Sequence, residues 1–437
     1  MLAAGGDAAS PPQPARANRT DTALASATDL HALLFIRCSP LLVPRFDSPQ
    51  PLPDAPRFPT PAHRPSDPGG RVSTVAYCET VTFSRIAVLG LGKVGHLAAT
   101  FLHQAGFEVG GIDQRAPAKP TSFPVTVADL GDIGEPNAIG RVLDGYEAVL
   151  SCLPFHLNRE VARTAHDRGM HYFDLTEDVG TSQMISELAA SATALMAPQC
   201  GLAPGFVSIV AASQVAEFDD CRSLRMRVGA LPQHPTGMLG YAFNWSPEGV
   251  VNEYLNDCEV IECGERKWLS SMEWRETLYI HGTQLEAFTT SGGLGTMCDT
   301  FHGTVANLDY KTIRYPGHMD LMNFYFHELL LRDRRELAGE ILTTAKPPVN
   351  DDVVYVHVSS EGTIDGQLRR LEFVRAYTPK TVGGAPHTAI AWTTAGSVAA
   401  VIELVRTGKL ASHGLLRQEH IALHDFLATP TGSHFAV

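Results

Sequence analysis

The sequence is short of basic residues and has no very long apolar run. It contains 34 Lys and Arg against 47 Asp and Glu, and its net charge is −13. This excess of negative charge opposes broad contact with nucleic-acid phosphates or anionic membrane surfaces, so neither is expected as a partner. No apolar run approaches the ~20 residues of a membrane-spanning helix. Because 44% of the 437 residues are hydrophobic, a soluble globular protein is expected.

Paired cysteines are also missing. The eight cysteines include no CxxC pair and no Cys/His group at zinc-ligand spacing, so no metal site is predicted. Cys258 and Cys263 are the closest pair, on a predicted strand. Since the sequence shows no secretory signal, we expect reduced thiols and a cytoplasmic location.

Residues 1–80 contain no lysine and show no helical or strand periodicity. They carry 7 Arg and 7 Asp or Glu, and they hold 13 of the 29 prolines. Such a segment buries too little apolar surface to offset the entropy of ordering it, which predicts a disordered, proline-rich tail. The alternative is an upstream extension from a misassigned start, with the folded protein beginning near Val81.

From Ser84 onward, short apolar strands alternate with helical patterns. This rhythm predicts an α/β fold, with a Rossmann-type doubly wound parallel sheet over residues 81–205. The predicted strands are 85–90, 107–113, 125–127, 148–151, 172–175 and 194–197, and the predicted helices are 93–104, 136–143, 159–167 and 182–192.

Residues 206–387 lose this rhythm and predict an α+β second domain. Residues 221–231 alternate apolar and polar side chains, as in a half-exposed strand. Two further strands, 353–359 and 371–377, flank the turn at Asp365 and Gly366. In the last segment, 388–437, a long helix of small apolar residues is expected to pack back onto the first domain.

A glycine motif occupies the first strand-to-helix turn. Gly90 permits a tight turn, Gly92 lets a pyrophosphate approach the backbone, and Gly95 allows close packing of helix on strand. Lys93 and Val94 lie between them, where a helix N-terminus offers free N–H groups to phosphate. The motif in this context predicts dinucleotide binding.

An acidic residue is expected about 20 residues further on, to bind the ribose hydroxyls. Asp113 stands 18 residues after Gly95 and favours NAD. Arg115 leaves NADP open, because it either balances a 2′-phosphate or is a solvated loop residue. Asp129, after the third strand, either borders the adenine or is a solvated carboxylate.

The turn after the fourth strand is a second candidate for cofactor contact, near the switch point of the predicted sheet. It either carries the rest of the cofactor or is an ordinary strand-ending turn. Its residues are Ser151, Cys152, Leu153 and Pro154.

Five segments together resemble the saccharopine dehydrogenase family, which includes saccharopine reductases and lysine 6-dehydrogenase-like enzymes. The resemblance spans about residues 84–425. It implies that a Rossmann domain is joined to an α+β domain that covers the nicotinamide, binds an amino-acid substrate and forms a homodimer. It also implies hydride transfer at a C–N bond. The five segments are 90–95, 151–155, 172–178, 200–205 and 311–318.

Three residues are candidates for binding a substrate carboxylate. Arg314 and Lys311 supply cations, and Gly201 opens a segment that offers free N–H groups before an apolar helix. A further glycine-rich run, 289–296, follows no convincing buried strand and lacks the GKS or GKT of a P-loop. It is interpreted as a loop of the substrate domain.

Acid–base candidates follow the fifth strand and lie in the second domain. Asp174 and Glu177, with Asp178, either recognise a substrate ammonium or act as base; the alternative is a solvated loop in which Asp178 caps the next helix. His318 is either a base that titrates near neutral pH or a satisfied histidine.

Two departures from the resemblance bear on the substrate. Ala203 and Phe155 stand where saccharopine reductases resemble one another in an aspartate and a tyrosine, which favours the lysine 6-dehydrogenase side. His156, next to Phe155, is a candidate replacement acid or base. The resulting hypothesis is an NAD(P)-dependent oxidoreductase acting on a lysine- or saccharopine-like amino acid. The alternatives are a dehydrogenase that forms carboxylated polyamines and a non-catalytic NAD-sensing module.

Overall fold

The computed structural model describes residues 83–118, 120–129 and 138–436, which belong to one compact unit. The predicted tail, residues 1–80, lies outside the described residues, as do Cys38 and Cys78. The six described cysteines are unpaired. Among the described residues, no group of His, Cys, Asp or Glu is placed to hold a metal ion.

The first sheet is parallel throughout, as predicted, and its strand order is β17-β6-β5-β4-β1-β2-β3. Alternate residues of each strand point to opposite faces, so Ile86 and Val88 pack in one core cluster and Ala87 and Leu89 in another. The strands are β1 Arg85–Leu89, β2 Glu108–Asp113, β3 Val125–Val127, β4 Ala148–Ser151, β5 His171–Asp174, β6 Leu195–Ala197 and β17 Gly414–Leu415.

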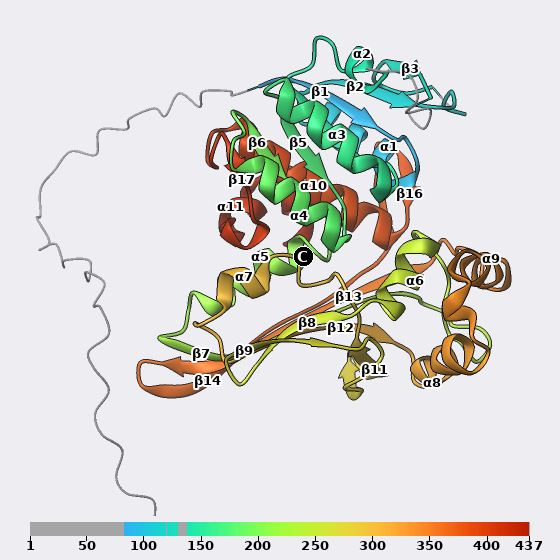
Figure 1. The fold of residues 1–437 in the computed structure, drawn as a ribbon, viewed down its shortest axis with the longest axis vertical. Coiled ribbons are helices and arrows are strands. Elements are labelled where there is room, and N and C mark those ends of the chain that lie inside the picture. Colours follow the sequence, from blue (N-terminus) through green and yellow to red (C-terminus); the bar gives the residue numbers. More distant parts are fainter. Residues whose placement is uncertain (1–82, 119, 130–137, 437) are drawn as a thin grey trace, which may run out of the picture. The chain divides into compact units, whose positions relative to one another are not determined.

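Helices cover both faces of this sheet, which confirms a doubly wound fold (Figure 1). Residues of α1 and α10 lie in the first core cluster, and residues of α3 and α4 lie in the second. The helices of this part are α1 Lys93–Gln104, α2 Ala138–Val142, α3 Phe155–Asp167, α4 Val179–Ala189, α5 Phe206–Val215, α10 Ala389–Arg406 and α11 Leu423–Ala428.

Two helix starts differ from the prediction. Helix α3 begins at Phe155 rather than at residue 159, because Pro154 occupies the N-cap and fixes a backbone suited to a helix entrance. Helix α4 begins at Val179 because the Asp178 side chain accepts a hydrogen bond from the Thr181 N–H at 2.7 Å. Asp178 therefore caps helix α4, which is the alternative that the sequence analysis gave for it.

The second sheet is mixed, with the path β10-β11-β12-β7-β13-β14 and with β8 pairing to β12 and β9. Its two central strands, β7 and β12, are parallel, and the other pairs are antiparallel. The strands are β7 Asp220–Pro232, β8 Cys258–Glu262, β9 Glu265–Leu269, β10 Glu276–Ile280, β11 Thr283–Thr289, β12 Asn307–Arg314, β13 Asp352–Ile364 and β14 Gln367–Tyr377.

The predicted turn at Asp365 and Gly366 joins β13 to β14, with both residues at positive φ. A further small sheet pairs β15 and β16. The remaining elements are β15 Lys380–Val382, β16 Ala385–His387, α6 Pro247–Leu255, α7 Met297–Phe301, α8 His318–Asn323, α9 Arg335–Ala345, a π-helical turn at 324–328, and 3-10 turns at 331–333, 418–420 and 432–435.

Helix α10 ties the two sheets together. It contacts α1 and β5 on one side and β13 on the other, and the C-terminal segment then adds β17 to the first sheet. Among the described helices, α10 is the one long and apolar enough to cross a membrane by length and composition. Because 83% of that stretch is buried inside the protein, it is placed as a core helix. The domain boundaries near residues 205 and 387 stay predictions.

Candidate active site

The glycine loop between β1 and α1 cannot accept a side chain at two of its three glycines. Gly90 has a φ of +84°, and a Cβ there would lie 2.9 Å from the carbonyl oxygen of Cys152. At Gly95 a Cβ would lie 1.8 Å from the carbonyl oxygen of Gly90. These two glycines therefore permit the tight turn and the close packing that the motif predicted.

Gly92 differs, because a Cβ built on it would meet no protein atom within 4 Å. Helix α1 begins next to it, and its first internal bond runs from the His96 N–H to the Gly92 carbonyl at 3.0 Å. Among the described residues, no acceptor bonds the N–H groups of Lys93, Val94 and Gly95. Open space beside free N–H groups at a helix N-terminus fits a pyrophosphate.

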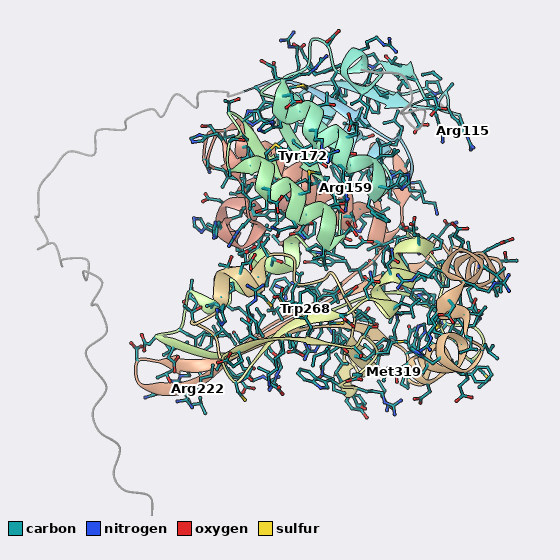
Figure 2. The ribbon with its side chains drawn as sticks, in the orientation of Figure 1. Arg115, Arg159, Tyr172, Arg222, Trp268 and Met319 are labelled. Carbon is teal, nitrogen blue, oxygen red and sulfur yellow. The ribbon has the colours of Figure 1, made fainter. Side chains whose placement is uncertain are left out.

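Asp113 ends β2 and braces the glycine loop. Its Oδ2 accepts a hydrogen bond from the Leu91 N–H at 2.6 Å, and its Oδ1 accepts one from the Arg115 N–H at 2.9 Å. The Arg115 side chain is exposed at the edge of the first sheet (Figure 2), and Asp129 is exposed as well. Neither placement distinguishes NAD from NADP.

The turn after β4 lies against this loop. Cys152 and Leu153 contact Gly90, and burial raises the pKa of the Cys152 thiol to about 12, so it stays protonated at neutral pH. The buried Ser151 hydroxyl donates to the Asn158 side chain at 2.7 Å, so it holds α3 in place. Pro154 caps α3, and its ring is exposed. The turn thus borders the glycine loop, and its contact with a cofactor stays a prediction.

A cavity of about 250 Å³ lies between the loops that follow β4 and β5 and helix α6. Phe155 and Trp268 line it, together with carboxylates from both parts of the chain. No Lys, Arg or His is among the described residues that line it. Its lining is therefore acidic, and the carboxylates are Glu177, Asp178, Glu253 and Asp257.

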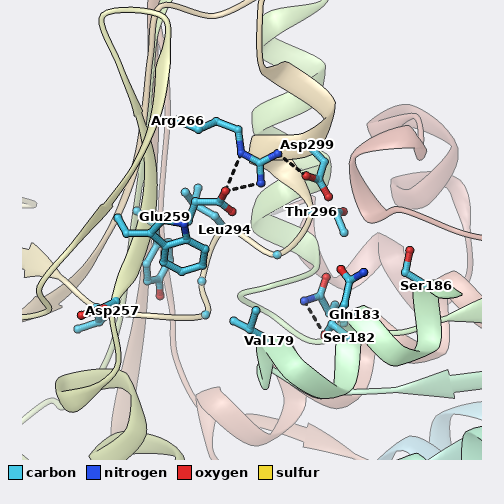
Figure 3. A pocket seen from close by; sticks show the side chains of 17 residues that line it. Val179, Ser182, Gln183, Ser186, Asp257, Glu259, Arg266, Leu294, Thr296 and Asp299 are labelled. Atoms are coloured by element: carbon cyan, nitrogen blue, oxygen red, sulfur yellow. Dashed lines mark hydrogen bonds and ion pairs between the residues drawn. The ribbon is translucent and has the colours of Figure 1, made fainter.

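A second cavity, of about 180 Å³, shares Val179, Asp257 and Trp268 with the first. Figure 3 shows the α4 side chains on one side of it, and Arg266, paired with Glu259 and Asp299, on the other. The glycine-rich run 290–296 forms part of its wall, as expected of a substrate-domain loop. Contrary to the sequence analysis, this run follows a buried strand, β11.

Glu253, like Asp257 and Trp268, lines the first cavity and was missed by the sequence analysis. Its side chain is 12% exposed, and its Oε2 has no hydrogen-bond donor among the described residues. The Nη2 of Arg314 lies 3.8 Å away. Burial raises the pKa of Glu253 to about 8; Arg314 opposes this shift and Glu177 adds to it.

Glu177 reaches the same helix from the other side. Its Oε1 lies where a Cβ on Gly249 would be only 2.6 Å away, and Gly249 is one turn before Glu253 on α6. Burial, followed by repulsion from Asp178 and Asp174, raises the pKa of Glu177 to about 7. The structure thus brings this predicted residue to the cavity.

His318 is buried and neutral, contrary to its interpretation as a base that titrates near neutral pH. Its Nδ1 bonds the Leu239 carbonyl at 2.9 Å, and its Nε2 bonds the Tyr254 hydroxyl at 3.0 Å. Burial and the nearby Arg314 lower the pKa of His318 to about 3. His318 is therefore a core histidine whose two ring nitrogens are both hydrogen-bonded, which is the other interpretation from the sequence.

Arg314 and Lys311 do not converge on one substrate group. They stand three residues apart on β12, and side chains of a strand alternate with a period of two, so they point to opposite faces. Arg314 donates to the Tyr254 hydroxyl at 2.7 Å and faces Glu253. Lys311 instead pairs with Glu276 at 2.8 Å, in a buried cluster with Arg227. Lys311 is thus a structural cation and not a group of the cleft.

Two further predicted groups are already satisfied by the fold. Asp174 is 0% exposed and accepts hydrogen bonds from the Tyr172 hydroxyl and the Gln199 N–H, which makes it a brace between β5 and β6. The segment after Gly201 does not offer free N–H groups. The first N–H groups of α5 bond carbonyls of the loop itself, those of Gly201, Leu202 and Gly205.

A family model described as "Saccharopine dehydrogenase C-terminal domain" matches residues 201–430, which is more than half of the chain. The chain belongs to the saccharopine dehydrogenase family. This confirms the resemblance drawn from the motifs.

A curated relative and a solved structure show how far sequences diverge among the proteins that this chain resembles. The saccharopine dehydrogenase [NADP(+), L-glutamate-forming] of Schizosaccharomyces pombe is 22% identical over 202 residues, which cover 44% of this chain and 45% of that protein. The match thus spans less than half of that relative. The apo saccharopine dehydrogenase (L-Glu forming) of Saccharomyces cerevisiae has the same fold, with a TM-score of 0.58 and 17% identity, over 77% of this chain and 94% of that one.

Relative to a Glu253→Gln variant, this family member is expected to become less stable as the pH rises from 6.5 to 8. Five described histidines with lowered pKa act in the opposite direction, because an unfolded histidine is still half protonated at pH 6.5, but they act equally on both proteins and cancel in the comparison. Glu253, whose pKa is raised to about 8, keeps its proton in the folded state where the unfolded state has lost it, so its contribution falls by about 2 kcal/mol over this range. Urea unfolding of the native chain and of the Glu253→Gln variant at both pH values measures this change. The difference in free energy of unfolding between the two proteins should shift by this amount, and a difference that is the same at both pH values would contradict the assignment.

Proposed function

We propose that the protein is a nicotinamide-dinucleotide-dependent oxidoreductase that acts on a carbon–nitrogen bond of an amine-bearing amino acid. The observation that carries the proposal is the acidic first cavity beside the dinucleotide cradle. Phe155 lines this cavity, and the turn just before it contacts Gly90 of the glycine loop. A bound nicotinamide would supply hydride acceptance or donation at the carbon next to nitrogen.

The charge of the cavity supports a lysine-like substrate over a saccharopine-like one. The carboxylates of Asp178 and Asp257 attract an ammonium group and repel substrate carboxylates, and a bound ammonium group also favours the ionised forms of Glu177 and Glu253. Two cations approach the cavity only through its carboxylates, since Arg314 lies 3.8 Å from Glu253 and Arg159 lies 3.8 Å from Asp178. A lysine side chain presents its ammonium at the end of an apolar stem, which suits walls that include Phe155 and Trp268.

A polyamine-type substrate is the second candidate, because the acidic lining continues beyond the first cavity. Asp257 lines both cavities, and Glu259 and Asp299 line the second. A longer molecule with several ammonium groups would meet Asp257 where the two cavities join, and in the second cavity it would compete with Arg266 for Glu259 and Asp299. A purely NAD-sensing role is less well supported, since it gives no reason for an unsatisfied carboxylate in the cleft. A homodimer and a cytoplasmic location stay predictions.

The test is a turnover screen with the purified protein. Lysine, saccharopine and polyamines are each offered with NAD⁺ and NADP⁺, and the absorbance of the reduced nicotinamide is followed. We expect reduction with an amine and less with saccharopine. The proposal would be contradicted if no amine reduced either coenzyme and if neither reduced coenzyme was oxidised in the reverse reaction.

The preference for NAD over NADP is tested by a substitution of Asp113. Asp113→Asn should weaken NADH binding about tenfold, because a charged acceptor for the ribose hydroxyls is lost while one oxygen still holds the Leu91 N–H. NADPH binding should not weaken, since the repulsion of a 2′-phosphate is removed. Fluorescence titration of the reduced coenzymes measures both. Tighter NADPH than NADH binding by the native chain would overturn the assignment of Asp113.

A further inference from the structure

We propose that Glu253 is the acid–base residue of the cleft, where its Oε2 takes the proton of a substrate ammonium group that Glu177 helps to hold. This inference rests on the proposed function, because it requires an amine in the first cavity. It concerns a residue for which neither the glycine motif nor the family resemblance predicted a role.

The first support is the unsatisfied oxygen. Oε2 of Glu253 is buried, and no described group donates a hydrogen bond to it. The nearest cation, the Nη2 of Arg314, is at 3.8 Å, beyond hydrogen-bond reach. Buried carboxylate oxygens are normally paired, so this one has capacity for a donor from the cavity. An ammonium group has three such donors.

The second support is the convergence of two carboxylates from different parts of the chain. Gly249 and Glu253 are four residues apart on α6, and such positions share one face of a helix. The Oε1 of Glu177 lies 2.6 Å from the position that a Cβ on Gly249 would occupy, next to the Trp245 ring. Glu177 comes from the loop after β5, so the two carboxylates approach the cavity from its two walls.

The third support is that Arg314 is held too firmly to close on Glu253. Its Nε donates to the Tyr254 hydroxyl, and its Nη1 donates to the Ile313 carbonyl at 2.9 Å and to the Thr312 hydroxyl. The Tyr254 hydroxyl is fixed in turn by His318 at 3.0 Å. Arg314 is therefore a positioning residue that steadies the charge of Glu253 without occupying its free oxygen.

The pKa values of Glu253 and Glu177 suit proton transfer from an ammonium group, since a general base works best when its pKa is near the operating pH. The pKa of Glu253 is raised to about 8 and that of Glu177 to about 7. The titratable and charged groups that act on Glu253 are Arg314, Tyr241, Tyr254, Cys258, Tyr310 and Glu177, and those that act on Glu177 are Asp174, Asp178, Glu248, Glu253 and Tyr310.

The step assigned to Glu253 moves one proton and no electrons. An N–H bond of the ammonium breaks, an O–H bond forms at Oε2, and the nitrogen keeps the electron pair as a neutral amine. That lone pair is needed before a C=N bond can form as hydride leaves the neighbouring carbon. In the reverse direction the protonated Glu253 returns the proton to nitrogen.

Binding of n-butylamine to the protein without coenzyme tests the site apart from turnover. Below about pH 10 this probe is an ammonium ion, like lysine. We expect the affinity of the native chain to rise with pH up to about 8, because the bound ammonium needs Glu253 ionised. Near pH 7, binding should therefore release close to one proton, which calorimetry in buffers of different ionisation enthalpy measures.

Three variants separate the roles. Glu253→Gln should bind at least tenfold more weakly and lose most of the proton release, keeping at most the half proton that Glu177 can release near pH 7. Glu177→Gln should bind more weakly and shift the rise in affinity to lower pH, because it removes a like charge beside Glu253. Glu340→Gln, which changes an exposed residue of α9 by the same charge, should behave as the native chain. An unchanged proton release in Glu253→Gln would overturn the proposal.

A variant that fails to fold must be distinguished from one that folds but does not bind the amine. Thermal melting is recorded for each variant, and if Glu253→Gln does not fold, Glu253→Asp replaces it. The shorter acid should weaken binding at least tenfold and shift its pH dependence; the native affinity and profile would overturn the proposal. Proton release in the native chain without turnover of any amine would contradict the proposed function alone. Turnover with an unchanged pH profile in Glu253→Gln would contradict the role of Glu253 alone.

Discussion

Gly92→Ala is expected to fold normally and to bind NADH about a hundredfold more weakly than the native chain. Its backbone is extended, with φ −64° and ψ −167°, and an added Cβ meets no protein atom, so the free protein tolerates alanine. The methyl group would stand where the pyrophosphate approaches the free N–H groups of α1. Losing two charge-assisted hydrogen bonds costs about 3 kcal/mol, which corresponds to that factor.

Gly95→Ala is the matched contrast, because its Cβ would lie 1.8 Å from a backbone oxygen of Gly90. The strand and helix must separate to admit it, and overpacking of this kind costs about 3 kcal/mol of stability. Urea unfolding and NADH titration of both variants separate the two effects. Native affinity in Gly92→Ala would show that the loop does not hold the coenzyme.

Arg227→Met is expected to lower the free energy of unfolding by about 3–5 kcal/mol, because it breaks a buried ion-pair cluster and leaves carboxylates uncompensated. Arg227 is 3% exposed and pairs with Glu276 and Asp309, which also pair with Lys311. This cluster lies on the face of the second sheet opposite Arg314. Binding of coenzyme and amine should therefore be unchanged.

The loss in Arg227→Met should shrink in acid. The paired cations lower the pKa of Glu276 to about 2, against the opposing effect of burial, so the stability it supplies is present above about 4.5 and is lost as the pH falls through 2. Arg222→Met is the control on the same strand, since Arg222 (Figure 2) is 64% exposed and lies 3.7 Å from its partner Asp220. It should change stability by less than about 0.5 kcal/mol. Equal losses in both variants would contradict the cluster.

The first sheet could be predicted because its signals are local. The strands 125–127 and 148–151 and the helix 93–104 have the predicted bounds, since buried apolar runs and glycine turns define them without distant partners. Strand β17 was missed because its two residues are a strand only through pairing with β6, more than two hundred residues earlier. Pairing of that kind leaves no periodic pattern.

Site residues that directly follow a predicted strand, such as Gly90 and Glu177, could be predicted from the sequence. Site residues that reach the cavity only through tertiary contacts could not. Glu253 sits in a helix whose sequence also suits a solvated face, and only the approach of Glu177 and Arg314 makes it a cavity residue. His318 became neutral through burial that its neighbours in sequence do not signal. The opposite directions of Lys311 and Arg314 did have a signal, their odd spacing on a strand.

The proposed activity is tested most directly by hydrogen transfer from a labelled substrate. The full chain is mixed with NAD⁺ and with lysine deuterated at the two carbons that bear nitrogen, and the reduced nicotinamide is analysed by mass spectrometry. Transfer at a C–N bond predicts one deuterium in the reduced nicotinamide and slower reduction than with unlabelled lysine. Reduced nicotinamide without deuterium, or no reduction with lysine or any other amine, would contradict it.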